Sequence, residues 1–168
     1  HVGETVSVSG WLHRWRPIGG FGFLVVRDRS GTAQAVIDTP ELLDGVYAES
    51  VVRVEGEVVA EPKAPGGVEL HNARVTVTSP AAEPPPFDLF RPQLNAQLPT
   101  LLDHAALSLR HPKQRALFEI ASASMDGFRG TLRGLGFTEI QTPKIVASAT
   151  ESGANVFKID YFGRTAYL

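Results

Sequence analysis

Short runs of alternating hydrophobic and polar residues fill the first half of the chain, and this alternation is typical of half-buried β-strands. In the first run, Val6, Val8 and Leu12 alternate with serine, tryptophan and histidine. The runs cover residues 6–13, 21–28, 33–38, 51–60 and 68–78. Clusters rich in glycine, proline or serine separate most of them and predict the intervening turns.

A short helix is predicted between the third and fourth strands, over residues 40–48. Thr39 suits its cap and Pro40 its first position. Three strands, a helix and two more strands are the element order of a β OB-fold barrel of five strands. The same order leaves open an unrelated small barrel, such as an SH3-like fold.

The second half changes to helical spacing. Hydrophobic residues recur there at steps of three or four: Leu117, Ala121, Met125, Phe128, Leu132 and Leu135. This spacing predicts an amphipathic helix of about 23 residues that begins near Pro112 and ends near two glycines. A strand over 137–142, a polar loop over 148–155 and a hairpin of 157–161 with 165–168 are predicted to follow. So few elements cannot bury a self-sufficient core.

A proline-rich segment, residues 79–86, separates the halves, because consecutive prolines continue neither a helix nor a central strand. We therefore expect a barrel domain over 1–79, a linker and hinge over 80–111, and the start of a second domain over 112–168. The chain begins at His1 and ends at Leu168 inside a strand-like run. It is accordingly expected to be a piece of a longer protein.

Composition excludes several kinds of protein. The 168 residues include 16 Lys and Arg against 18 Asp and Glu, and no cysteine. Nucleic-acid binding by bulk charge, disulfides and thiolate metal sites are therefore excluded. No apolar run suits a membrane span or a secretory signal, so a cytoplasmic protein is expected. The histidines lack metal-ligand spacing, and we expect no metal site.

Positive charge is nevertheless concentrated in residues 11–30, which carry four arginines against one aspartate, interleaved with four aromatic residues. If Leu24 and Val26 point into the barrel, Phe23 and Arg27 point outward together. This pattern favours a platform on which nucleic-acid bases stack beside arginines. The alternative is that the aromatic rings fill the barrel and the arginines are solvated.

Residues 10–13 (Gly-Trp-Leu-His) and 19–34 together resemble the anticodon-binding OB domain of class IIb aminoacyl-tRNA synthetases, most closely the aspartyl-tRNA synthetases. Residues 136–145 independently resemble class II motif 1, a helix and strand ending in a proline at the dimer interface. Residues 149–157 and 161–168 resemble the flipping loop and hairpin of the archaeal-type enzymes. The resemblance implies an OB-fold barrel followed by the α+β start of a class II catalytic domain.

The resemblance also implies roles for single residues. Phe23 matches the aromatic residue on which the central anticodon uridine stacks, and Gln34 matches the residue that hydrogen-bonds this base. Arg16 matches a basic residue near the anticodon, and Glu69 a carboxylate near its first base. Glu69 could instead be an exposed strand residue.

Outside the predicted anticodon site, Glu151 matches the flipping-loop glutamate that holds the ammonium group of substrate aspartate, and Pro143 matches the motif 1 proline. A solvated loop residue is the alternative for Glu151. His13 and Pro62 stand where the resemblance places the residues of non-discriminating enzymes. Those enzymes charge both tRNA-Asp and tRNA-Asn.

The implied parent protein is an aspartate–tRNA ligase, a cytoplasmic homodimer that uses ATP, Mg²⁺, L-aspartate and tRNA. Motifs 2 and 3 of the class are absent from residues 1–168, so this piece is expected to hold no catalytic residue and to be inactive alone. One alternative is an asparaginyl- or lysyl-tRNA synthetase. Another is a stand-alone OB-fold protein that binds single-stranded RNA.

Overall fold

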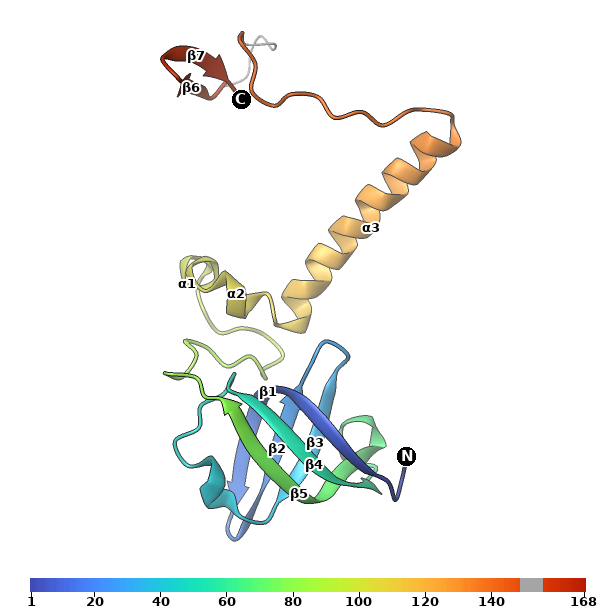
Figure 1. The fold of residues 1–168 in the computed structure, drawn as a ribbon, viewed down its shortest axis with the longest axis vertical. Coiled ribbons are helices and arrows are strands. Elements are labelled where there is room, and N and C mark those ends of the chain that lie inside the picture. Colours follow the sequence, from blue (N-terminus) through green and yellow to red (C-terminus); the bar gives the residue numbers. More distant parts are fainter. Residues whose placement is uncertain (149–155) are drawn as a thin grey trace. The chain divides into compact units, whose positions relative to one another are not determined.

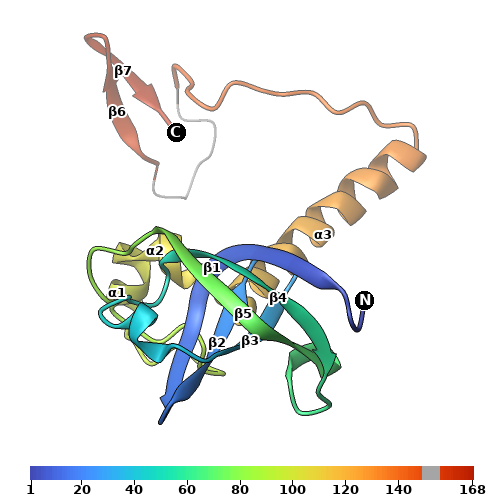
Figure 2. The same ribbon diagram turned by 60° about the horizontal axis from the view of Figure 1, so that its bottom comes forward.

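A computed structural model describes residues 1–148 and 156–168, which divide into two compact units, His1–Leu117 and Phe118–Leu168. The first unit contains a closed barrel (Figures 1 and 2). Its strands are β1 (Thr5–Ile18), β2 (Phe21–Arg27), β3 (Thr32–Ile37), β4 (Val51–Ala60) and β5 (Val68–Ser79). They lie in the order β1-β2-β3-β5-β4, and only β3 and β5 run parallel. The predicted OB-fold is confirmed.

The barrel interior is formed by every second residue of these strands. Its best-buried members are Leu12, Leu24, Ile37, Val52 and Val54. Trp15 packs against this core from β1, and its ring lies so close to Gly22 that a side chain there would collide with it. The prediction that Leu24 and Val26 point inward is therefore confirmed, and the core-filling alternative is correct for Trp15.

Two short 3-10 helices, η1 (Pro40–Leu43) and η2 (Pro65–Gly67), lie in the barrel loops. The helix predicted over 40–48 is too long, because Gly45 turns the chain with a φ of 73°. Thr39 precedes η1 as predicted, but its side chain makes no capping hydrogen bond. Leu43 is buried in the barrel core.

The segment after β5 is folded onto the barrel, as part of the first unit. Residues 80–97 form neither helix nor strand, and α1 (Leu98–Asp103) and α2 (Ala105–Ser108) follow. Phe87 and Leu89 are buried, and the backbone N–H of Ala81 donates to Ser50 Oγ at 2.9 Å. The chain is thus anchored at Ala81 within the proline-rich segment and at Phe87 and Leu89 just after it.

Helix α3 (Pro112–Gly134) matches the predicted 23-residue helix. It ends in a Schellman motif, in which the Phe137 and Gly136 amides donate to Leu132 and Arg133. The strand predicted over 137–142 is wrong. These residues have no partner strand among those described, and an extended segment without a partner forms no ladder.

The predicted hairpin is present as β6 (Lys158–Tyr161) and β7 (Arg164–Tyr167). Its turn uses positive φ angles at Phe162 and Gly163, which suit the twist of a two-residue hairpin loop. None of the helices in the described parts of the chain is long and apolar enough to cross a membrane.

Candidate nucleic-acid interface

The outward side chains of β1, β2, β3 and β5 form one continuous surface. Two rows of directly paired residues cross it: Arg16, Phe23 and Val36 in one row, and Arg14, Val25, Gln34 and Glu69 in the next. We call these seven residues the outer face. A β-bulge between Leu12 and Arg14 sets the pairing of β1, so that Arg14 and Arg16 both point outward. The surface therefore depends on one inserted residue, His13.

Phe23 lies half-buried on the outer face. Its ring meets that of Phe21 edge to face, with centroids 5.6 Å apart, and the guanidinium of Arg16 lies 5.0 Å from its centroid. The exposed Arg16 makes no hydrogen bond or ion pair with any described residue, so its donors are available to a ligand. The structure thus brings the predicted residues Arg16 and Phe23 together.

Gln34 is a diagonal neighbour of Phe23, because Phe23 pairs with Val36 and Gln34 pairs with Val25. Its Nε2 donates to Glu69 Oε2 at 2.8 Å, and His71 Nε2 lies 2.8 Å from Glu69 Oε1. Glu69 is only 7% exposed, so the alternative of an exposed strand residue is wrong. Since a carboxylate can only accept, the bond fixes the Gln34 amide with its NH₂ toward Glu69 and leaves its carbonyl oxygen unused.

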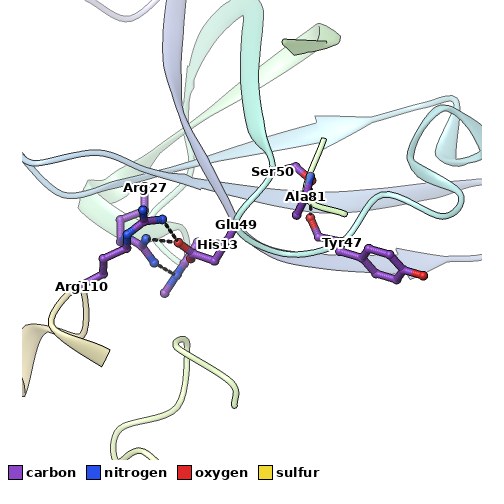
Figure 3. Close-up of polar contacts among 7 residues, drawn as sticks. All are labelled: His13, Arg27, Tyr47, Glu49, Ser50, Ala81 and Arg110. Atoms are coloured by element: carbon purple, nitrogen blue, oxygen red, sulfur yellow. Dashed lines mark hydrogen bonds and ion pairs between the residues drawn. The ribbon is translucent and has the colours of Figure 1, made fainter. Parts of the chain in front are cut away.

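His13 and Pro62 make their contacts elsewhere. Pro62 lies in the β4–β5 loop, which the Glu61 amide closes by donating to the Gly67 carbonyl at 3.0 Å. His13 belongs to a cluster with Arg27, Glu49 and Arg110. In Figure 3 both arginines bind the Glu49 carboxylate, and Arg27 also bonds to His13. We call these four residues the Glu49 cluster. His13 therefore does not lie beside the Gln34–Glu69 pair.

The Glu49 cluster joins the barrel to the segment after α2. Glu49 Oε2 accepts from Arg27 at 2.8 Å and from Arg110 at 2.7 Å, while Oε1 has no partner among the described residues. Both guanidiniums also lie over the Trp11 ring, at 5.6 and 4.7 Å. The Glu49 side chain is 6% exposed, so Arg27 and Arg110 are needed to compensate its charge.

His13 has a fixed hydrogen-bonding role in this cluster. Arg27 donates to its Nδ1 at 2.8 Å, so Nδ1 must be unprotonated. Burial, and then the charge of Arg27, lower the pKa of His13 below its usual value of 6.5. The imidazole is therefore held neutral, with its proton on Nε2.

The remaining predicted residues lie outside the first unit. Pro143 is exposed in the extended segment that follows α3. Glu151 lies outside the described residues, so the structure says nothing of it. Among residues 1–148 and 156–168, no group of three or more His, Asp or Glu side chains that could hold a metal ion is found.

Sequence reasoning missed Glu49 and Arg110. Glu49 lies in a loop with a φ of 69°, a conformation that glutamate seldom adopts and that no sequence pattern announces. Arg110 is 61 residues away in the chain. Arg27 was expected to point outward, and it does leave the core, but Glu49 covers it. The only feature of the sequence that pointed to the Glu49 cluster is the concentration of arginine and tryptophan in and near β1.

An OB-fold barrel with an arginine-and-aromatic outer face defines a class, the OB-fold nucleic-acid-binding domains. The family model described as "OB-fold nucleic acid binding domain" matches residues 6–78, and that of "tRNA synthetases class II (D, K and N)" matches residues 97–167. This chain therefore combines an OB-fold nucleic-acid-binding domain with a segment that matches the class II tRNA synthetases (D, K and N).

The chain is similar to Aspartate--tRNA(Asp/Asn) ligases. Over 168 residues it is 45% identical to that of Deinococcus radiodurans and 42% identical to that of Thermus thermophilus. All of this chain is covered, but only 38% and 39% of those relatives' lengths. Its fold is similar to the asparaginyl-tRNA synthetase of Pyrococcus horikoshii complexed with asparaginyl-adenylate, with a TM-score of 0.83 and 34% identity. That match covers 99% of this chain and 39% of the other.

Proposed function

We propose that this chain recognises the anticodon of tRNA with its outer face, within a protein that acts as an aspartate–tRNA ligase. The observation that carries the proposal is that Phe23 and Gln34 are diagonal neighbours on the outer face, with the Gln34 amide fixed by Glu69. An aromatic ring beside an oriented amide suits a single splayed base. The names of the relatives supply the amino acid and the tRNA.

The orientation of Gln34 selects the base. The carbonyl oxygen left unused by Glu69 can accept the N3–H of uracil, while the ring of Phe23 supplies a stacking surface. Cytosine presents an acceptor at N3 and would leave the Gln34 carbonyl facing another lone pair. The pair Phe23–Gln34 therefore reads the central anticodon uridine.

Arg16 and Glu69 complete the proposed anticodon site. Arg16, held over Phe23, provides charge for the backbone next to the stacked base. Glu69 is predicted to contact the first anticodon base, and its oxygens already accept from Gln34 and bond to His71. Each carboxylate oxygen can accept a second hydrogen bond, so guanine N–H groups can still be bound.

The same proposal extends to tRNA-Asn. Relatives of this chain are named for both tRNAs, and His13 and Pro62 match the residues of non-discriminating enzymes. Because His13 contacts Arg27 and does not face Gln34, it acts on selectivity indirectly, through the position of β1. The loop that holds Pro62 would set how strictly the third anticodon base is read.

For the whole protein, we propose activation of L-aspartate with ATP and Mg²⁺ and transfer to tRNA, in the cytoplasm. Glu151 is proposed to hold the substrate ammonium group. The matched length is about two fifths of the relatives, and we expect motifs 2 and 3 of the class to lie outside residues 1–168. This chain alone should therefore catalyse neither step.

We also propose that the whole protein is a homodimer formed through motif 1. In the second unit, Met125 and Phe128 of α3 and Phe137 and Ile140 beyond it are more than half exposed and line a groove of about 570 Å³. Burying such side chains against a second copy would contribute about 25 cal/mol per Å². Pro143 would end the dimer element.

Binding to RNA hairpins of one stem and different loops tests the proposed function. Fluorescence anisotropy with G-U-C, G-U-U, G-A-C and U-U-U anticodons should give the tightest binding for the first two. Equal affinity for all four would support a general single-strand binder and overturn the proposal. Preference for U-U-U would favour a lysyl-tRNA synthetase, and G-U-U alone an asparaginyl enzyme.

A further inference from the structure

We propose that Arg14, stacked on Phe90, is a second RNA contact that binds a backbone phosphate of the anticodon arm without reading its sequence. The inference rests on the proposed function, since it takes the same RNA as ligand. Neither Arg14 nor Phe90 is among the site residues that the family resemblance implies. The contact extends the outer face onto the segment that follows the barrel.

Arg14 is exposed and lies two residues from Arg16 on the same side of β1, so both guanidiniums serve one surface. Its guanidinium lies 4.5 Å from the centroid of the Phe90 ring. Among the described residues it makes no hydrogen bond or ion pair. Its charge is therefore uncompensated, and all its N–H donors remain for a ligand.

Phe90 is held in place on both sides along the chain. Leu89 is 4% exposed, and the Arg91 carbonyl accepts from Nε2 of the buried His111 at 2.9 Å. The turn also contains an ion pair of 2.8 Å between Arg91 and Asp88. Phe90 thus presents a fixed ring, and a guanidinium stacked on it loses less conformational freedom when it binds.

The chemistry favours a phosphate over a base at this point. The guanidiniums of Arg14 and Arg91 already lie 4.5 and 5.7 Å from the Phe90 centroid and so compete with any base for stacking on this ring. Asp88 compensates the positive charge of Arg91, whereas the charge of Arg14 has no ion-pair partner among the described residues. A planar guanidinium with free donors matches a phosphate in both charge and geometry.

The test compares Arg14→Gln with Arg53→Gln in the 168-residue chain. Arg53 is also an exposed barrel arginine, but it pairs with Ser9 and Thr76, outside the outer face. Affinities for the G-U-C and G-A-C hairpins are measured at several salt concentrations. Arg14→Gln should weaken the binding of both hairpins severalfold, by the same factor. The slope of log K against log salt should become less steep by about 0.7–0.9.

Two further variants separate charge from stacking. Arg14→Lys should keep the salt slope but lose part of the affinity, and Phe90→Ala should do the same without touching the arginine. Arg14→Gln binding like wild type, or like Arg53→Gln, would overturn the inference. So would a loss confined to one loop sequence, which would indicate a base contact.

The outcome can be separated from that of the proposed function. If wild type prefers G-U-C and Arg14→Gln changes nothing, only the phosphate contact fails. If wild type shows no loop preference but Arg14→Gln lowers both affinities and the salt slope, the anticodon proposal fails and the phosphate contact stands.

Discussion

Arg16 lies over Phe23 on the outer face of the barrel, and Arg27 lies over Trp11 near the segment that follows α2. Both arginines belong to the same β1–β2 hairpin, and each lies over an aromatic ring. Around Phe23 the arginine is exposed and the fixed Gln34 amide has an unused carbonyl. Around Trp11 the arginine is 9% exposed and bound to Glu49.

The difference shows that residue type alone does not identify a binding surface. In the Glu49 cluster, the donors of Arg27 are spent on Glu49 and His13, and Arg110 covers the same ring. Those groups stabilise the attachment of the following segment. On the outer face, comparable groups are left with unused hydrogen-bonding capacity, which is what a base or phosphate requires.

The largest effect is expected from Glu49→Gln, which leaves the charges of Arg27 and Arg110 uncompensated. The free energy of unfolding should fall by about 3 kcal/mol. Urea unfolding followed by tryptophan fluorescence reports on the barrel, because both tryptophans lie in β1. Glu57→Gln, at an exposed position of β4, should cost less than about 0.5 kcal/mol. Equal effects would show that the Glu49 cluster is not structural.

Phe23→Ala should leave unfolding almost unchanged but weaken binding of the G-U-C hairpin by about 1–3 kcal/mol, through lost stacking. The matched control is Phe162→Ala, which removes an exposed ring from the β6–β7 turn. Anisotropy titrations of both variants measure the effect. Unaltered affinity in Phe23→Ala would remove the ring from the proposed site.

Glu69→Gln tests whether the second buried carboxylate contributes less to stability than Glu49 does. No arginine in the described part of the chain is bound to Glu69, so the free energy of unfolding should fall by only about 1–2 kcal/mol, from weakened bonds to Gln34 and His71. Binding of G-U-C should fall as well, because Gln34 is less firmly oriented. A loss of unfolding free energy as large as that of Glu49→Gln, measured by the same urea titration, would contradict the proposed difference between the two regions.

The smallest effect concerns pH. Because the pKa of His13 is lowered in the folded chain, the unfolded chain binds the proton more tightly. The stability contributed by neutral His13 is complete above about pH 6.5 and is lost as the pH falls toward its folded pKa. Unfolding measured at pH 7.5 and 5.5 should therefore show a larger loss in wild type than in His13→Asn, whose side chain still accepts from Arg27. Identical pH profiles would contradict this role.

Much of the barrel could be predicted because alternation depends only on which side of a strand is buried. Leu24 and Val26 pointed inward as expected, and this placed Phe23 on the opposite side. The long helix was equally predictable, since its apolar spacing and terminal glycines are local signals. These features need no knowledge of distant residues.

The features that could not be predicted depend on distant parts of the chain. Nothing local to Arg27 shows that Glu49 and Arg110 will cover it, and the bulge at His13 arises only from pairing with β2. The strand expected over 137–142 lacks a partner among the described residues, which an apolar pattern cannot supply. Similarly, the bond between Gln34 and Glu69 depends on the parallel pairing of β3 and β5.

A mutant cycle between Gln34 and the central anticodon base tests the central claim most directly. Affinities of wild type and Gln34→Ala are measured for hairpins with G-U-C and G-A-C loops. If Gln34 reads the uridine, Gln34→Ala should weaken G-U-C by about 1–3 kcal/mol and leave G-A-C unchanged. Equal losses for both loops would contradict the claim that this amide recognises the base.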